Sequence, residues 1–194
     1  MTITTRVIIL RTIKYSEADL VIHAIDKHGD KLNFLAKSAL KSRKRFGGGV
    51  LEPLNYVEIN YKSNRDIEKL HFLNEAKIIE DFDGLRKDYE RLELGLYFLQ
   101  VIDKVSFGGD QQSPDSFNLL GHALRQAQTT SKLELLRCLF ELKLLQYQGV
   151  LENQEQYKEL LSHPVSNCNN IDIDSKSLNR LQRQVHQTLV EWLN

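Results

Sequence analysis

The sequence has very few of the residues that build covalent or metal-bound scaffolds. Its two cysteines, Cys138 and Cys168, lie 30 positions apart, and there is no CxxC pair. Two thiols so placed provide neither a disulfide framework nor a four-cysteine zinc site. We expect Cys138 to be buried in a helix and Cys168 to lie in a polar loop. Cys168 and His163 would supply two metal ligands, fewer than a site needs, so the sequence predicts no metal and no cofactor.

Long apolar runs are missing too. No run approaches the roughly 18 residues that span a bilayer. The four strong apolar residues at positions 7–10 stand between two arginines and are too few for the core of a signal peptide. The hydrophobic fraction of 41% and the charged fraction of 27% are ordinary for a soluble globular protein. We therefore expect a cytoplasmic protein.

Motifs of common enzyme active sites are also absent. The sequence contains no HExxH and no GxSxG. The three glycines at positions 47–49 are not followed by the GK[ST] of a phosphate-binding loop. Asp81 and Asp83 are close in sequence, but acids beside a helix start commonly interact with the helix dipole. The six histidines are scattered, with no visible pairing to a nucleophile, so we expect no enzymatic activity.

Apolar residues follow a strand pattern in the first eighty residues. Many of them are β-branched or alternate with polar residues, as when Val57, Ile59 and Tyr61 occupy every second position. Five short strands with no long helix among them are typical of a small closed barrel of the OB type, and a separate SH3-like barrel is the alternative. The predicted strands cover residues 6–15, 19–26, 31–39, 54–62 and 69–79.

From about residue 83 the apolar residues follow a helical period instead. Residues 106–116 contain Gly-Gly and a proline, which end the first helix, and the next begins at Pro114 or Asp115. Residues 133–149 are apolar nearly all round, which predicts a central buried helix closed by Gly149. The sequence thus predicts an α+β protein with an OB domain at 1–80 and a helical domain at 81–194. One face of the first helix is expected to carry Leu85, Tyr89, Leu92, Leu96 and Leu99, and one face of the last helix Leu178, Leu181, Val185, Leu189 and Trp192.

Positive charge gathers in one stretch of an otherwise neutral chain. Lys+Arg and Asp+Glu both number 26, yet residues 1–80 have 14 basic and 10 acidic residues, and the remainder has 12 and 16. Residues 36–53, AKSALKSRKRFGGGVLEP, here called the basic segment, have no acid before Glu52. A solvated loop is the simplest interpretation, but repulsion within so dense a cluster is relieved when the cations face phosphates. Its five cations are Lys37, Lys41, Arg43, Lys44 and Arg45.

Phe46 and the glycines that follow it allow several interpretations. Phe46 could be a plain exposed aromatic, a platform on which a base stacks, or a plug at the end of the barrel. Glycine permits backbone conformations closed to other residues. The residues alone therefore favour a basic arm, hinged on glycines, that contacts nucleic acid. On the first strand, Arg6, Arg11 and Lys14 are weaker candidates, for which ordinary strand-surface charge is the alternative.

Several stretches together resemble one family. VIILRTIKYSEADLVI and GDKLNFLAKSALKSRKRFGGGVLEPLNYVEI are similar to the opening of the RecO family of bacterial recombination mediators, whose pattern is close to LAKGARKSKSRFGGxLEPF. Ser38 stands where that pattern has glycine, and Leu40 where it has a basic residue. LNEAKIIEDFDGLRKDYERL and LFELKLLQYQG extend the similarity to about residue 150. Relatives that carry four zinc-ribbon cysteines after the central helix differ from this chain, which has NQEQYKELLSHPVSNCNNIDID there and looks short at its end.

The resemblance implies a function in DNA repair and recombination. It implies binding to single- and double-stranded DNA, annealing of strands coated by single-strand-binding protein, and work with RecR to load RecA in the nucleoid. It also implies that the helical domain binds the C-terminal tail of single-strand-binding protein, for which Arg125, Arg137 and Lys143 are candidates. An OB-fold protein that binds RNA, or a protein–protein adaptor, are the alternatives. The cations of the basic segment would then neutralise two backbones at once, which lowers the repulsion between complementary strands.

Overall fold

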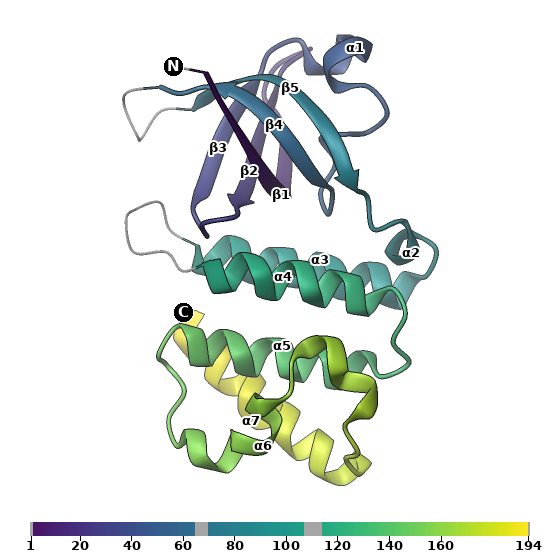
Figure 1. Ribbon diagram of the computed structural model, residues 1–194, viewed down its shortest axis with the longest axis vertical. Helices are drawn as coiled ribbons and strands as arrows, with labels where there is room; N and C mark the ends of the chain where they lie inside the picture. Colours follow the sequence, from purple (N-terminus) through teal and green to yellow (C-terminus); the bar gives the residue numbers. More distant parts are fainter. Residues whose placement is uncertain (1, 65–69, 107–113, 194) are drawn as a thin grey trace. The chain divides into compact units, whose positions relative to one another are not determined.

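The structure, a computed structural model, describes residues 2–64, 70–106 and 114–193 (Figure 1). The chain divides into two compact units. The first comprises Met1–Phe82 and Leu99–Phe117, and the second comprises Asp83–Phe98 and Asn118–Asn194. The division into an OB domain at 1–80 and a helical domain at 81–194 stays a prediction.

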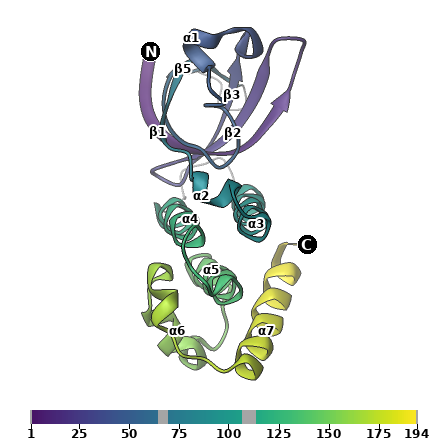
Figure 2. The same ribbon diagram turned by 90° about the vertical axis from the view of Figure 1, so that its right-hand side faces the viewer.

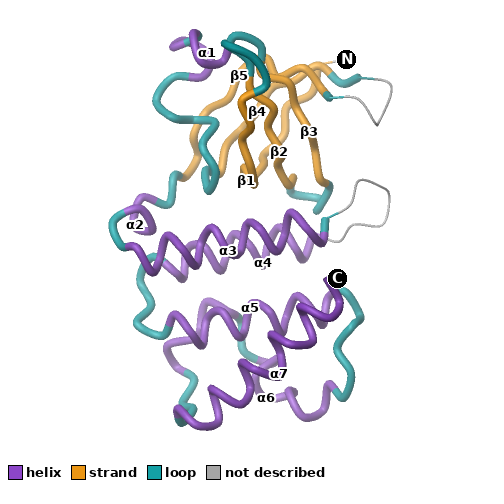
Figure 3. The backbone as a smooth tube through the Cα atoms, turned by 180° about the vertical axis from the view of Figure 1, so that it is seen from behind, coloured by secondary structure: helices purple, strands orange, loops and turns teal. Residues whose placement is uncertain are grey.

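Five strands of the first unit form a closed barrel in the order β1-β2-β3-β5-β4, drawn in orange in Figure 3. β4 closes the barrel by pairing with β1, and all neighbours are antiparallel except β3 and β5. This is the five-stranded arrangement of an OB fold, as predicted. The strands are β1 (Thr2–Lys14), β2 (Leu20–Asp26), β3 (Lys31–Ala36), β4 (Tyr56–Lys62) and β5 (His71–Glu80).

Alternating side chains fill the barrel. On β4, Val57, Ile59 and Tyr61 are buried as predicted, and on β3 the Phe34 ring meets Tyr61 edge-on with 5.1 Å between centroids. β1 is long because it pairs with β4 along its first half and with β2 along its second, with a register shift between Ile9 and Arg11. Apolar side chains therefore fill the interior of the barrel, and a binding site must lie on its outer surface or on the connections between strands.

The helices follow the predicted order but not the predicted phase. Leu85 lies in a short helix of its own, and Asp88 starts the next helix by accepting a hydrogen bond from the Arg91 N–H at 3.0 Å. This break shifts the apolar face, so the predicted positions Tyr89 and Leu96 are exposed. The helices are α2 (Asp83–Arg86), α3 (Tyr89–Val105), α4 (Pro114–Ala127), α5 (Leu133–Tyr147), α6 (Lys158–Ser162) and α7 (Ser175–Leu193).

Helix α5 is the centre of the second unit, as its apolar sequence predicts. Ten of its residues are buried, and Gly149 follows it at φ 68°, a left-handed conformation that suits glycine. α7 packs against α5 at an angle (Figure 2), and its buried residues are Leu181, Val185 and Leu189. None of the helices among the described residues is long and apolar enough to cross a membrane.

The polar stretch between α5 and α7 is more ordered than expected. It forms α6 and two 3₁₀ helices, η2 (Gln154–Tyr157) and η3 (Val165–Asn170). Cys168, predicted as a loop thiol, is fully buried, with its sulfur 3.3 Å from the Thr130 hydroxyl. Burial raises the pKa of the Cys138 thiol to about 12. Among the described residues, no group of three or more His, Cys, Asp or Glu side chains could hold a metal ion.

Candidate nucleic-acid interface

The basic segment folds as two short helical turns, not as an extended arm. After β3 come a 3₁₀ turn, η1 (Ala39–Lys41), and one turn of α-helix, α1 (Arg43–Phe46). Ser38 precedes η1 at φ 54°, in the left-handed region that glycine occupies most readily. This geometry explains the glycine at the same position in the pattern that the sequence resembles.

Apolar side chains attach these turns to the barrel. Ala39, Phe46, Val50 and Leu51 are all buried in the same core as the strands. The Thr12 hydroxyl on β1 donates a 2.6 Å hydrogen bond to the Leu51 carbonyl oxygen. The segment is thus held by packing and by hydrogen bonds along its second half.

The turn between β1 and β2 holds the first half. The Ser38 N–H donates to Asp19 Oδ1 at 2.7 Å, and the Leu40 N–H donates to the Ala18 carbonyl at 3.0 Å. Tyr15, in the same turn, is exposed. The turn and the basic segment therefore form one surface at this end of the barrel.

The three glycines end α1 and turn the chain back toward β4. A Cβ atom on Gly47 would lie 2.3 Å from the Arg43 carbonyl oxygen, so no larger residue fits there without a backbone shift. Gly48 and Gly49 have φ values of 67° and 71°. Two consecutive left-handed residues are easily formed only by glycine. The fold therefore requires glycine at these positions, and the predicted hinge stays a prediction.

All five cations of the segment are exposed. Arg45 is fixed in place: its Nε donates to Ser42 Oγ at 3.1 Å, its Nη2 donates to the Lys37 carbonyl at 2.9 Å, and its guanidinium lies 5.0 Å from the Phe46 ring centroid. Within the described residues, the side chains of Lys41, Arg43 and Lys44 make no hydrogen bond or ion pair. Their charge is therefore presented to solvent from a fixed backbone.

Phe46 lies where the plug interpretation places it. Its side chain is 7% exposed and belongs to the barrel core, so it has no free face for a base, and its assignment as a stacking platform is corrected. Phe72 on β5 is instead 39% exposed, with Lys37 Nζ 5.0 Å from its ring centroid. Sequence reasoning missed Phe72. The sequence places Phe72 directly before Leu73, an apolar residue that faces the core. Because successive side chains of a strand point to opposite faces, an aromatic residue at position 72 must lie on the outer face.

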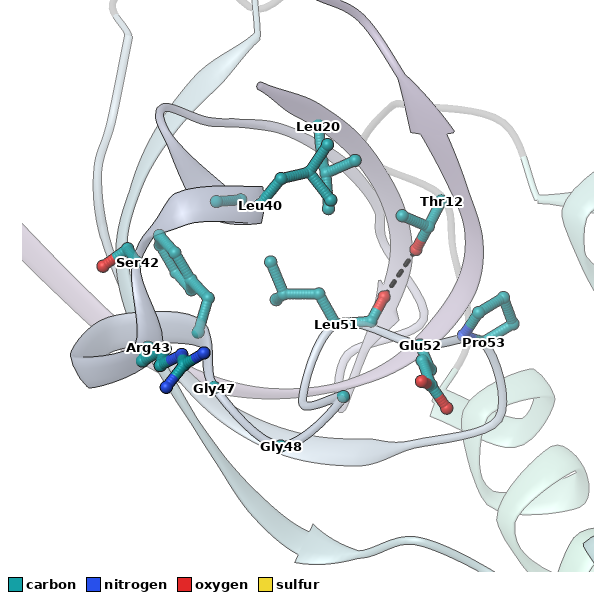
Figure 4. A pocket seen from close by; sticks show the side chains of 13 residues that line it. Thr12, Leu20, Leu40, Ser42, Arg43, Gly47, Gly48, Leu51, Glu52 and Pro53 are labelled. Atoms are coloured by element: carbon teal, nitrogen blue, oxygen red, sulfur yellow. Dashed lines mark hydrogen bonds between the residues drawn. The ribbon is translucent and has the colours of Figure 1, made fainter. Parts of the chain in front are cut away.

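A hollow of about 360 Å³ lies between the basic segment and the start of β2 (Figure 4). Leu20, Leu40 and Leu51 give it an apolar lining, and Arg43 and Glu52 stand at its edge. Leu40, where the family pattern has a basic residue, is 55% exposed. The surface around the cations therefore also offers apolar contacts.

The weaker candidates on β1 are partly engaged by acids of the same unit. Arg6 Nε lies 3.9 Å from Glu58 Oε2, and Arg11 Nε lies 3.9 Å from Asp103 Oδ2. Lys14 is exposed at the end of β1. Arg6 and Arg11 would have to share their charge with these carboxylates, so Lys14 is the best placed of the three to contact phosphate.

The three candidates for partner binding in the helices are in different surroundings. Lys143 is only 8% exposed and donates to the Leu161 carbonyl at 2.9 Å, so its candidacy is corrected, because a buried ammonium cannot reach a partner. Arg137 binds Glu141 Oε1 at 3.0 Å and lies 4.2 Å from the Tyr97 ring centroid. Arg125 is exposed on α4. Arg125 and Arg137 remain candidates, the latter already tied to its own unit.

Two family models match the chain, and together they cover most of residues 1–153. The family model for the N-terminal part of recombination protein O matches residues 1–82, and the model for its C-terminal part matches residues 86–153. The chain belongs to the RecO family. The first match therefore contains the barrel and the basic segment, and the second ends a few residues after α5.

Named relatives agree with the family models. The chain is 32% identical over 151 residues to the DNA repair protein RecO of Alkaliphilus metalliredigens, which covers 77% of this chain and 59% of the relative. It is 30% identical over 141 residues to that of Syntrophus aciditrophicus, covering 73% and 53%. It is 35% identical over 103 residues to that of Thermodesulfovibrio yellowstonii, covering 53% and 38%. The matches thus span from about two fifths to three fifths of these relatives' lengths.

Proposed function

We propose that the protein is a DNA repair and recombination mediator that binds single- and double-stranded DNA and anneals complementary strands. The observation that carries this proposal is the basic segment, which exposes five cations on the connection between β3 and β4 of an OB barrel. Membership of the RecO family supports the role in repair. We place this work in the cytoplasm, at the nucleoid.

Annealing by this surface needs no catalytic residue. Two strands repel each other through their phosphates, and cations that contact both backbones lower that repulsion. Lys41, Arg43 and Lys44 are suited to this because they project from a backbone that core packing holds in place. Little ordering entropy is then lost when the segment binds. The protein would act by position and charge, without making or breaking a covalent bond.

Phe72 would add selectivity for unpaired bases. Stacking of one base on an aromatic ring contributes about 1–3 kcal/mol and requires a base that is free of its partner. Phe72 is exposed on the outer face of β5, and Lys37 Nζ lies 5.0 Å from the centroid of its ring. A strand whose phosphate meets Lys37 could therefore place a base against Phe72.

Protein partners complete the proposal. The family resemblance suggests that RecR joins this protein in loading RecA, and that the C-terminal tail of single-strand-binding protein docks on the helical part. Arg125 and Arg137 are the accessible cations among the candidates for the acidic tail.

The test combines binding with annealing. Complementary oligonucleotides coated with single-strand-binding protein are mixed with wild type or with the variant Arg43→Glu, Lys44→Glu and Arg45→Glu. We expect the variant to lose annealing and most DNA affinity while its melting temperature stays near that of wild type, because all three side chains are exposed. A matched control is Lys27→Glu with Lys104→Glu and Lys158→Glu, three exposed lysines outside both cation groups. Wild-type annealing by the segment variant would remove the basic segment from the mechanism.

A further inference from the structure

Helix α7 carries a second group of exposed cations, in a part of the chain that neither family model matches. Lys176, Arg180 and Arg183 recur at intervals of four and three residues, so they lie within roughly 60° of one another around the helix axis. All three are exposed, on a different face from the buried Leu181 and Val185. α7 thus has one face for the core and one basic face for solvent.

Helix α7 supplies no acid of its own along this face. The sequence from residue 175 to residue 190 contains no Asp or Glu. Asp174, just before the helix, accepts hydrogen bonds from the N–H groups of Lys176 and Ser177, both at 3.0 Å, and is occupied as the cap. Among the described residues, the side chains of the three cations form no ion pair or hydrogen bond. Surface helices usually intersperse opposite charges at such spacings, and here only one sign is present.

The residues around the cations favour a sugar–phosphate backbone over a peptide. The residues beside the three cations on this surface are Ser177, Asn179 and Gln184, all with polar side chains. Serine, asparagine and glutamine donate hydrogen bonds to phosphate oxygens in many protein–DNA complexes. A docked acidic peptide would need apolar side chains to pack its anchor residues, and none of these six residues is apolar.

The spacing also fits a nucleic-acid strand. Seven residues separate Lys176 from Arg183, which is about 10.5 Å along the helix at a rise of 1.5 Å per residue. One strand of duplex DNA presents a phosphate about every 3.4 Å along its axis. The cations therefore span about three nucleotide steps.

We propose that the basic face of α7, formed by Lys176, Arg180 and Arg183 with Ser177, Asn179 and Gln184, is a second binding site for the phosphate backbone of DNA. This inference rests on the proposed function, since it adds a second contact to the same activity. One chain would then hold DNA through two separate surfaces, one on the barrel and one on α7. Annealing benefits directly, because it requires two strands to be held at once.

The experiment measures the affinity of the full chain for a labelled DNA duplex at several salt concentrations. The test variant is Arg180→Gln with Arg183→Gln, since glutamine keeps helix propensity and removes only charge. The matched control removes two exposed cations elsewhere, Lys104→Gln with Lys158→Gln. A third variant, Arg43→Gln with Lys44→Gln, reports on the basic segment independently. A labelled polyglutamate peptide serves as the competing acidic probe.

The expected result is a flatter salt dependence in the α7 variant and an unchanged one in the control. With about 0.9 per phosphate contact, the slope of log affinity against log salt should become less steep by roughly 1.8. Between about 50 and 200 mM salt, wild type should then lose roughly twelve times more affinity than the variant does. If the double variant melts early, Lys176→Gln alone should still flatten the slope by about 0.9.

Failure of the inference differs from failure of the proposed function. A wild-type slope in the α7 variant, beside a flattened slope in the basic-segment variant, would overturn the inference alone. A polyglutamate affinity that falls in the α7 variant while its DNA slope is unchanged would overturn it in favour of an acidic protein partner. Absence of salt-dependent DNA binding in wild type would overturn both.

Discussion

Two long connections of this chain invite comparison: the basic segment at residues 36–53, and the polar stretch between α5 and α7 at residues 150–174. Both look like loops in the sequence, and both fold into short helical turns. Both are also held by buried side chains, Phe46 and Leu51 in the first, Cys168 and Ile171 in the second. Each connection is therefore held in place by side chains that are buried in the core of its own unit.

The two connections differ in the charge that they expose. The basic segment carries five cations and one acid, whereas the polar stretch carries Lys158 as its one lysine or arginine and five acids. Anchors explain how a connection is held, and they are similar in the two cases. The sign of the exposed charge decides what the surface can bind, and only the basic segment suits a polyanion.

Removing the central anchor of the basic segment should have the largest effect. Phe46→Ala should lower the free energy of unfolding by about 3–5 kcal/mol, as truncation of a core phenylalanine does. Melting temperature and denaturant unfolding measure this loss. Leu40→Ala is the control, because that side chain is largely exposed. A stable Phe46→Ala protein with weakened binding to single strands alone would restore the stacking interpretation.

The anchor of the polar stretch provides the matching test. Ile171→Ala should cost about 2–5 kcal/mol of stability, as truncation of a buried isoleucine does. DNA affinity should not change below the melting transition. A loss of DNA binding by the folded variant would show that the two connections are not functionally distinct.

Phe72→Ala should separate stacking from charge. Loss of one stacked base should weaken single-stranded binding by about 1–3 kcal/mol, with little effect on duplex binding. Lys37→Gln is the companion variant, and it should weaken both. Titrations of each variant with the two forms of DNA measure the difference. Equal losses on both forms from Phe72→Ala would mean that the ring only supports Lys37.

A smaller effect should appear in the pH dependence of stability. Burial lowers the pKa of His71 below its usual value of 6.5, and its Nδ1 accepts a 3.1 Å hydrogen bond from the Asn64 N–H, which requires the neutral ring. The unfolded chain therefore binds the proton at a higher pH than the folded chain does. The contribution of His71 is fully present above pH 6.5 and is lost as the pH falls toward the folded pKa.

His71→Gln should reduce this pH dependence, since the glutamine amide oxygen can accept the same hydrogen bond without titrating. Melting temperatures measured from neutral pH downward test the expectation. If the melting temperature fell equally with pH in wild type and in the variant, the pH dependence of stability would come from other groups.

The strands could be read from the sequence because their period is short and repeated. Val57, Ile59 and Tyr61 occupy every second position of one strand, so they share the face that points into the barrel, while the residues between them share the outer face. The face of α3 could not be read in the same way. Asp88 caps a new helix two residues after α2 ends, and this break, which the spacing of leucines does not reveal, changes the phase of every later position.

The candidate site shows the same limit. The cations of the basic segment were evident from composition, and their exposure is what charge leads one to expect. The burial of Phe46 and the exposure of Phe72 were not evident. Phe46 lies in a turn of four residues, too short for any period to indicate which side faces the core. Cys168 was misjudged for the same reason, because η3 has only six residues.

The most direct test of the central claim is the salt dependence of single-stranded DNA binding. With about 0.7 per phosphate contact, the five cations of the basic segment should contribute roughly −3.5 to the slope of log affinity against log salt. Lys41→Gln, Arg43→Gln and Lys44→Gln together should make that slope less steep by roughly 2.1, with little change in melting temperature. A wild-type slope in this folded triple variant would contradict the account, because the phosphates would then be held elsewhere.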